Sequence, residues 1–245
     1  MINCITPNSE LIRFDPNIDS INKPETFYSF DSTYWELIVR KEKSQNIIKH
    51  NLLRLGIKQY DYKAKYYLSE EEKEWAKQLM EEFPKPLIAI CTSSKETVKN
   101  WPLDHWVDLI DSISPEFSII QLGDHKEPIL ENVNRFAGKH TMRESAALLS
   151  QANFFIGPDS LLMHIANGLN IKSIIIFGGS RPANCFGYKD NINLTTQPEC
   201  SPCWIHDGHE KCAHKIKCMN TIKKSQVLHA VDLLSKSNSE INQNN

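Results

Sequence analysis

Hydroxyl groups and lysines gather in one short segment that could bind phosphate. Thr92, Ser93 and Lys99 follow the apolar run at 87–91, and Pro102 comes shortly after them, where a helix could begin. Side-chain hydroxyls, a lysine and the amino end of a helix can all bind phosphate oxygens. The same residues would suit an ordinary solvated loop, so this segment by itself leaves both interpretations open.

A second polar turn opens a helical pattern and could bind a hydroxylated ligand. The segment Gly157-Pro158-Asp159-Ser160 ends an apolar run, and Asp159 or Ser160 could cap a helix whose positive end faces a bound diphosphate. Asp159 would accept hydrogen bonds from hydroxyl groups, because a carboxylate repels phosphate. His164, about one helical turn further on, could reach the same crevice. A plain helix cap and an inward-packing histidine are the alternative.

Gly123 marks a third turn, beside polar residues where the base or ribose of a nucleotide could lie. The common nucleotide motifs G-x-x-x-x-G-K-[ST] and G-x-G-x-x-G are missing, and so are H-E-x-x-H, G-x-S-x-G and Asp-x-Asp. A P-loop nucleotidase, a standard dinucleotide enzyme and a transferase that holds its donor through carboxylate-bound Mg²⁺ are therefore not expected. Lysine and helix ends would have to neutralise any phosphate charge.

Four of the seven cysteines crowd into one short segment, at Cys200, Cys203, Cys212 and Cys218. Four thiolates could close a tetrahedral site for zinc or iron. Free thiols and disulfides are the other interpretations. A site closed by four cysteines is structural, so we expect no cofactor to be required for catalysis.

Elements of an α/β fold must position these residues. Short apolar runs at 87–91, 117–122, 153–157 and 173–177 suit strands buried on both faces, and the spacing leaves room for crossover helices. The predicted helices lie at 68–82, 103–114, 142–151, 160–168 and 221–236. Ser69, Thr141 and Ser160 are candidate helix caps. We predict a doubly wound, Rossmann-like parallel sheet, with the polar turns together at the carboxyl ends of its strands.

The chain divides into three predicted parts. Residues 1–60 lack a repeated strand-and-helix unit and form a short amino-terminal appendage, with a short helix ending at Gly56. Residues 61–237 form the α/β domain, which includes the cysteine-rich segment 200–218. Residues 238–245 are polar and predicted to be a disordered tail.

Composition excludes several classes of partner. The formal net charge is −2, which gives no general attraction to nucleic acid, and no run of 18 apolar residues exists. The first residues lack the basic and apolar regions of a leader peptide. We expect a soluble, cytoplasmic protein with no nucleic-acid partner and at most a peripheral contact with membranes.

Several motifs in one order resemble the ADP-heptose:lipopolysaccharide heptosyltransferases, glycosyltransferase family 9. The resemblance covers about residues 50–235 and corresponds to the carboxyl-terminal, donor-binding domain of the two-domain GT-B architecture. The motifs are Lys99-x-Trp101-Pro102, Leu122-Gly123, Ala137-Gly138-Lys139, Gly157-Pro158-Asp159-Ser160, His164-Ile165-Ala166, Phe177-Gly178, Cys200-x-x-Cys203 and Cys218-Met219.

The resemblance implies transfer of a sugar, typically a heptose, from a nucleoside diphosphate donor such as ADP-heptose to a saccharide acceptor such as lipopolysaccharide. Transfer would invert the sugar's configuration and need no divalent metal. Lys99 would then stabilise the leaving diphosphate. The other donor-binding residues implied are Thr92, Ser93, Gly123, Asp159, Ser160 and His164.

Two departures from the family pattern bear on function. Leu161 stands where the family usually has a small residue, so a bulkier side chain adjoins the expected sugar site. The family's complete amino-terminal acceptor domain is replaced by about 50 residues, and none of their carboxylates matches its base motif, so the general base is unknown. The alternative to a complete enzyme is a non-catalytic or split-enzyme subunit that binds the nucleotide-sugar, with a second polypeptide or a homo-oligomer supplying the rest.

Overall fold

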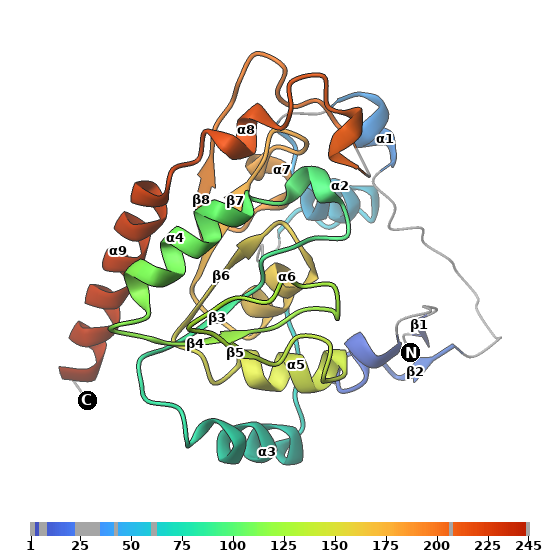
Figure 1. The fold of residues 1–245 in the computed structure, drawn as a ribbon. Coiled ribbons are helices and arrows are strands. Elements are labelled where there is room, and N and C mark those ends of the chain that lie inside the picture. The colour runs from blue at the N-terminus through green and yellow to red at the C-terminus, as the bar shows by residue number, and fades with distance from the viewer. Residues whose placement is uncertain are drawn as a thin grey trace.

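The computed structural model describes residues 3–4, 9–22, 35–41, 44–59, 63–205 and 208–243. Six parallel strands form its main sheet, in the order β5-β4-β3-β6-β7-β8 (Figure 1). From β3 the chain moves outward through β4 to β5, then returns to add β6, β7 and β8 on the other side of β3. The sheet is therefore doubly wound, as predicted. The strands are β3 (Leu87–Ile90), β4 (Ser118–Gln121), β5 (Asn134–Arg135), β6 (Phe154–Pro158), β7 (Ser173–Phe177) and β8 (Ile192–Thr195).

Helices cover both faces of this sheet. One core lies under α3, α5, α6 and α7, and a second lies under α4, α8 and α9. The helices are α3 (Glu70–Met80), α4 (Leu103–Ile113), α5 (Met142–Leu149), α6 (Leu161–Gly168), α7 (Ala183–Phe186), α8 (Lys217–Asn220) and α9 (Lys224–Gln243).

Strand β3 shows why the sheet could be recognised from its sequence. Leu87 and Ala89 belong to the core under α3, α5 and α6, whereas Ile88 and Ile90 belong to the core under α4 and α9. All four side chains are fully buried. A strand covered on both faces needs apolar residues at every position, and this produces the continuous apolar run.

The helix caps agree largely with the sequence. Ser69 and Thr141 both form reciprocal capping boxes, with Glu72 and Glu144 respectively. Ser160 occupies the N-cap position of α6 as predicted, but its side chain makes no capping hydrogen bond. Its hydroxyl is thus not used to complete the helix.

The edges and the end of the fold differ from the prediction. The sequence did not indicate β5 or β8, because both are edge strands and neither has a continuous apolar run. The last helix continues to Gln243, so helix extends into the tail predicted to be disordered from residue 238, since no glycine or proline interrupts it. Residues 244–245 lie outside the described part.

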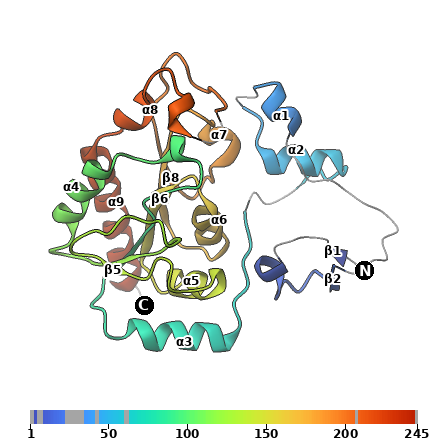
Figure 2. The same ribbon diagram turned by 45° about the vertical axis from the view of Figure 1, so that its right-hand side comes forward.

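The amino-terminal segment contains a small parallel pair of strands and short helices. They are β1 (Asn3–Cys4), η1 (Ser9–Ile12), β2 (Ser20–Ile21), α1 (Trp35–Val39) and α2 (Ile47–Arg54). After α2 ends, Gly56 takes the left-handed conformation (φ 75°), close to the predicted helix end. Asn46 Nδ2 donates to the carbonyl of Cys185 in α7 at 3.2 Å. Figure 2 shows α2 on the same side of the sheet as α7.

Arg143 ties this segment to the domain. Its guanidinium donates to the carbonyls of Glu10 (2.9 Å) and Tyr67 (2.8 Å), and to Glu72 Oε2 (2.6 Å). This pairing lowers the pKa of Glu72, chiefly through the hydrogen bond from Arg143.

Within the described residues, no helix has the length and apolar character needed to cross a membrane.

Candidate functional site

The predicted site residues lie where β3 and β6, neighbours in the sheet, end and the chain reverses its direction of winding. Such a switch point is where ligands bind in open α/β sheets. Lys99 follows β3 in the short turn η2 (Thr97–Lys99), and Asp159 and Ser160 follow β6. At Gly157 in β6, an added Cβ would lie 2.5 Å from the Phe155 ring and 3.2 Å from the Cys91 carbonyl. Glycine therefore lets the ends of the two strands approach closely.

Lys99 is the central charge of this site. Its Nζ lies 2.9 Å from Asp159 Oδ2 and 3.5 Å from Glu96 Oε2. The Lys99 and Asp159 side chains are only 8% and 6% exposed, so both charges are withdrawn from water. Neither of these two carboxylate oxygens has a hydrogen-bond partner among the described residues. Lys99 and Asp159, which the sequence placed in separate turns, are thus brought together.

Glu96 and Arg181 extend this cluster and were missed in the sequence. Arg181 Nη2 lies 2.7 Å from Glu96 Oε1, and its guanidinium carbon lies 5.2 Å from the centre of the Phe186 ring. The sequence does contain a signal for Arg181, because this residue follows the apolar run of β7 just as Asp159 follows β6. The pairing itself joins turns far apart in the chain and could not be inferred.

Ser160 presents an unused hydroxyl at the amino end of α6. Its Oγ is buried and has no hydrogen-bond partner within the described part of the chain. Leu161, the next residue, is 41% exposed. A ligand at this helix end would meet a free hydroxyl, backbone N–H groups and an apolar side chain.

Thr92 and Ser93 bind a carboxylate in this structure. Glu127 accepts hydrogen bonds from the Thr92 backbone N–H (2.9 Å) and hydroxyl (2.6 Å), and from the Ser93 N–H (3.1 Å) and hydroxyl. Gly123, with φ 136°, makes room for it, because an added Cβ would lie 2.7 Å from Glu127 Cγ. The hydroxyls predicted to bind phosphate thus hold the buried carboxylate of Glu127, and their binding of a ligand stays a prediction.

His164 lies in α6 beside the charged cluster. Its Nδ1 is 2.8 Å from the hydroxyl of Tyr188. Burial lowers the pKa of His164, while Asp159 raises it and Lys99 lowers it further. The imidazole is therefore neutral near pH 7 and can offer its other nitrogen to a neighbour.

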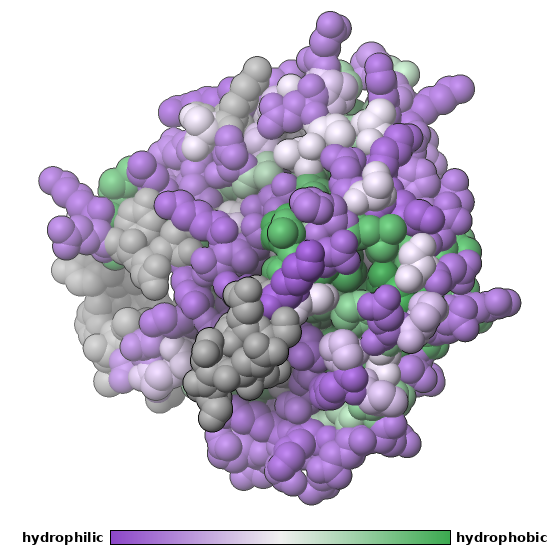
Figure 3. Space-filling model, turned by 90° about the vertical axis from the view of Figure 1, so that its left-hand side faces the viewer, coloured by the Kyte–Doolittle hydropathy of each residue, from purple (hydrophilic) through white to green (hydrophobic). Residues whose placement is uncertain are grey.

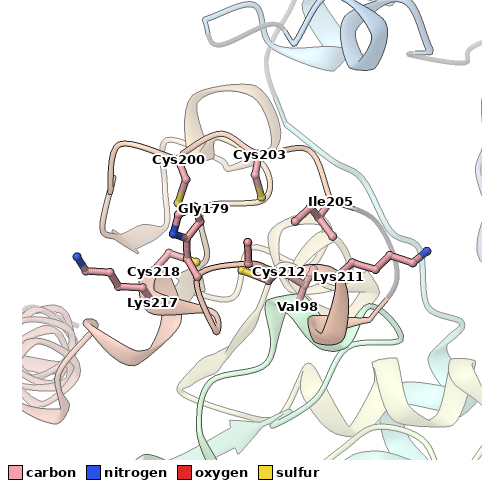
Figure 4. Close-up of a pocket in the computed structure, with 11 residues that line it drawn as sticks. Val98, Gly179, Cys200, Cys203, Ile205, Lys211, Cys212, Lys217 and Cys218 are labelled. Atoms are coloured by element: carbon pink, nitrogen blue, oxygen red, sulfur yellow. The ribbon is translucent and has the colours of Figure 1, made fainter.

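The four predicted metal ligands lie around a hollow of about 200 Å³. Cys200, Cys203, Cys212 and Cys218 all line it (Figure 4). The backbone N–H of Ile216 donates to Cys212 Sγ at 3.4 Å, and burial raises the pKa of the Cys203 and Cys218 thiols. In the described ranges, no three His, Cys, Asp or Glu groups are close enough to hold an ion as they stand. The thiol donor set nevertheless suits zinc or iron.

A doubly wound parallel sheet with charged turns at its switch point defines an open, Rossmann-like α/β domain. The family model for glycosyltransferase family 9 (heptosyltransferase) matches residues 30–214. The chain therefore belongs to this family.

Known relatives agree with this assignment. Lipooligosaccharide heptosyltransferase 2 of Haemophilus influenzae is 26% identical over 113 residues, which cover 40% of this chain and 33% of the relative. The chain thus aligns with about a third of the length of that curated relative.

Solved structures show the same fold. The iron-containing dodecameric glycosyltransferase TibC from enterotoxigenic E. coli H10407 has a TM-score of 0.70 at 19% identity, over 96% of this chain and 68% of TibC. Heptosyltransferase II of E. coli has a TM-score of 0.56 at 17% identity, over 71% of this chain and 54% of that protein. A family 9 glycosyl transferase from Veillonella parvula has a TM-score of 0.62 at 16% identity, over 91% of this chain and 64% of that protein.

Proposed function

We propose that this protein binds a nucleoside diphosphate sugar at the switch point and takes part in transfer of the sugar, a heptose, to a saccharide acceptor of the lipopolysaccharide type. Membership of the heptosyltransferase family supports the reaction class. The observation that carries the proposal is the buried Lys99, held between the ends of β3 and β6. A buried cation at this place is suited to a diphosphate.

Lys99 would act on the leaving group. As the bond from the sugar to the diphosphate breaks, negative charge grows on the phosphate oxygens, and a positioned ammonium lowers the energy of that state. Lys99 carries three N–H donors, and its Nζ forms an ion pair with Asp159 Oδ2 at 2.9 Å that lacks the geometry of a hydrogen bond. When Lys99 turns toward the diphosphate, Asp159 Oδ2 would accept a hydrogen bond from a hydroxyl of the sugar or ribose.

Ser160 and Glu127 would complete the donor site. The buried Ser160 hydroxyl and the amino end of α6 would donate to a phosphate. Glu127 follows β4, and its buried carboxylate, bonded to Thr92, Ser93 and Gln121, would fix the turn beside the donor site rather than contact the donor. Thr92, Ser93 and Gly123 would then serve by placing Glu127 rather than by binding phosphate directly.

The acceptor side is part of the same proposal. Residues 1–60 would lie on the acceptor side, and a second polypeptide or another copy of the chain would add to the acceptor surface. The solved relative TibC is described as dodecameric, so assembly of this chain is worth measuring.

The cysteine segment would hold zinc or iron as a structural cross-link. The bound ion would fix the loops that carry Cys200, Cys203, Cys212 and Cys218 against one another, and the ion would take no part in sugar transfer. TibC, described as iron-containing, supports iron as one candidate.

Calorimetric titration with ADP tests the proposal, with UDP and GDP as controls for the base. We expect ADP to bind to the wild type and binding to be lost in Lys99→Ala. Lys95→Ala is the matched control, because Lys95 lies exposed in the same loop. ADP-heptose turnover is then measured for the same proteins. Absence of binding by all three nucleotides would overturn the donor-site proposal.

A further inference from the structure

Arg181 lies outside the motifs that define the family resemblance, yet it reaches the centre of the site. It follows β7 (Ser173–Phe177), the neighbour of β6 in the sheet. Its side chain is 9% exposed and lies over the Phe186 ring. A buried arginine needs a compensating charge, and Glu96 supplies it at 2.7 Å.

Glu96 stands between two cations at unequal distances. Its Oε1 is 2.7 Å from Arg181 Nη2, whereas its Oε2 is 3.5 Å from Lys99 Nζ. The first distance is that of a charge-assisted hydrogen bond, and the second is longer than one. Glu96 is thus bonded to Arg181 and is only near Lys99.

The four charges of the cluster add to zero, with Lys99 and Arg181 balanced by Glu96 and Asp159. An incoming diphosphate must therefore compete with carboxylates for Lys99. With Glu96 held by Arg181, the only carboxylate at hydrogen-bond distance from Lys99 Nζ among the described ion pairs is Asp159, at 2.9 Å. Without Arg181, Glu96 would be free to form a short hydrogen bond to Lys99.

We infer that Arg181 is a positioning residue for the donor site: it holds Glu96 away from Lys99 and so keeps the lysine available to a nucleoside diphosphate. This inference rests on the proposed function for its ligand. It assigns Arg181 no contact with the phosphates, and that distinguishes it from a second phosphate-binding cation.

Substitution in a double-mutant cycle tests the inference. We expect R181Q to bind ADP about 10- to 100-fold more weakly than the wild type, because a charge-assisted hydrogen bond from Lys99 to Glu96 must be broken before the ligand binds. E96Q should bind ADP at least as tightly as the wild type. The double variant E96Q/R181Q should recover wild-type affinity, since the competing carboxylate is gone. Arg40→Gln, at an exposed position, is the control for loss of an arginine.

The outcomes distinguish a positioning role of Arg181 from a direct contact between Arg181 and the ligand. If E96Q/R181Q binds ADP as weakly as R181Q, Arg181 contacts the ligand and the positioning role is wrong. If R181Q binds ADP like the wild type, the inference is also wrong. A crystal structure of R181Q without ligand gives a second measurement, in which the distance from Glu96 to Lys99 should shorten to about 2.8 Å. That distance still tests the inference if the wild type binds no ADP, a result that would count against the proposed function alone.

Discussion

The switch-point cluster and the cysteine segment both gather reactive side chains, but they are built in opposite ways. At the switch point, Lys99, Glu96, Asp159 and Arg181 come from turns fixed by neighbouring strands, and each charge already faces an opposite charge. The four cysteines come from irregular chain and α8, and they surround a hollow. Strand register therefore organises the first region, whereas the second is expected to need a bound ion.

Figure 3 shows a mostly hydrophilic face of the molecule, which can be compared with these two regions. Apolar side chains gather near its centre, on the side of the molecule where α4 and α9 lie. The helices α4 and α9 pack on the sheet through apolar residues. Their packing therefore does not depend on a charged cluster like the one around Lys99. Under the proposed function, the charge at the strand ends serves the ligand rather than the fold.

Removal of the central lysine should produce the largest effect. Lys99→Ala is expected to reduce turnover of the donor by about 1,000-fold, or about 4 kcal/mol in the transition state. Steady-state kinetics with ADP-heptose checks this, and Lys95→Ala is the control. Circular dichroism must show that the variant is folded, since Asp159 loses its partner. Turnover within tenfold of the wild type would contradict the role assigned to Lys99.

Loss of one cysteine should disturb the second region and leave the first unchanged. Cys203→Ser is expected to lose the bound ion and about 3 kcal/mol of stability, or roughly 10 °C in Tm. Elemental analysis and calorimetry measure both. Cys185→Ala, outside the segment, should retain the metal. A wild-type protein that is folded, binds ADP and contains no metal would remove the contrast between the two regions.

Substitution of Thr92 tests whether the hydrogen-bond donors around Glu127 serve to position its carboxylate. Thr92→Val removes a 2.6 Å hydrogen bond to Glu127 and should cost about 2 kcal/mol of stability, because a buried carboxylate loses a donor. Chemical denaturation measures this loss. Ser112→Ala, whose exposed hydroxyl donates to the Asp108 carbonyl within α4, is the control and should change little. If stability is unchanged while ADP binding falls, Thr92 contacts the ligand directly.

The smallest expected effect is a pH dependence at His164. The folded protein holds the pKa of this histidine below 6.5, mainly through burial. As the pH falls below 6.5, the unfolded chain takes up a proton there before the folded one does, so stability decreases. His164→Gln should lose less stability than the wild type between pH 7 and pH 5, measured by urea unfolding. An identical decline in both proteins would show that other groups cause it.

The sheet was predictable and its charged pairs were not. Buried strands such as β3 and β6 are recognisable as continuous apolar runs, and the turns after them contain Lys99 and Asp159. The edge strands β5 and β8 lack this signal because their side chains are only partly buried or exposed. Gly123 was predicted to lie at the donor site, which stays a prediction, and its close approach to Glu127 could not be inferred from the sequence.

Pairing between turns accounts for the rest of what sequence reasoning missed. Glu96 and Arg181 are 85 positions apart, and no pattern within either turn indicates the other. The position of Lys99 could be guessed from its motif, but its burial and its contact with Asp159 depend on the register between β3 and β6. Such contacts become visible only when the strands are placed.

The burial of the switch-point charges determines how nucleotide binding should depend on ionic strength. Mobile ions weaken interactions between exposed charges strongly, but they hardly enter a site whose lysine is 8% exposed. Nucleotide held by Lys99 should therefore remain bound in concentrated salt, where attachment through scattered surface lysines would fail. The protein would then select its ligand by fit to a few enclosed groups rather than by the long-range attraction of a basic surface.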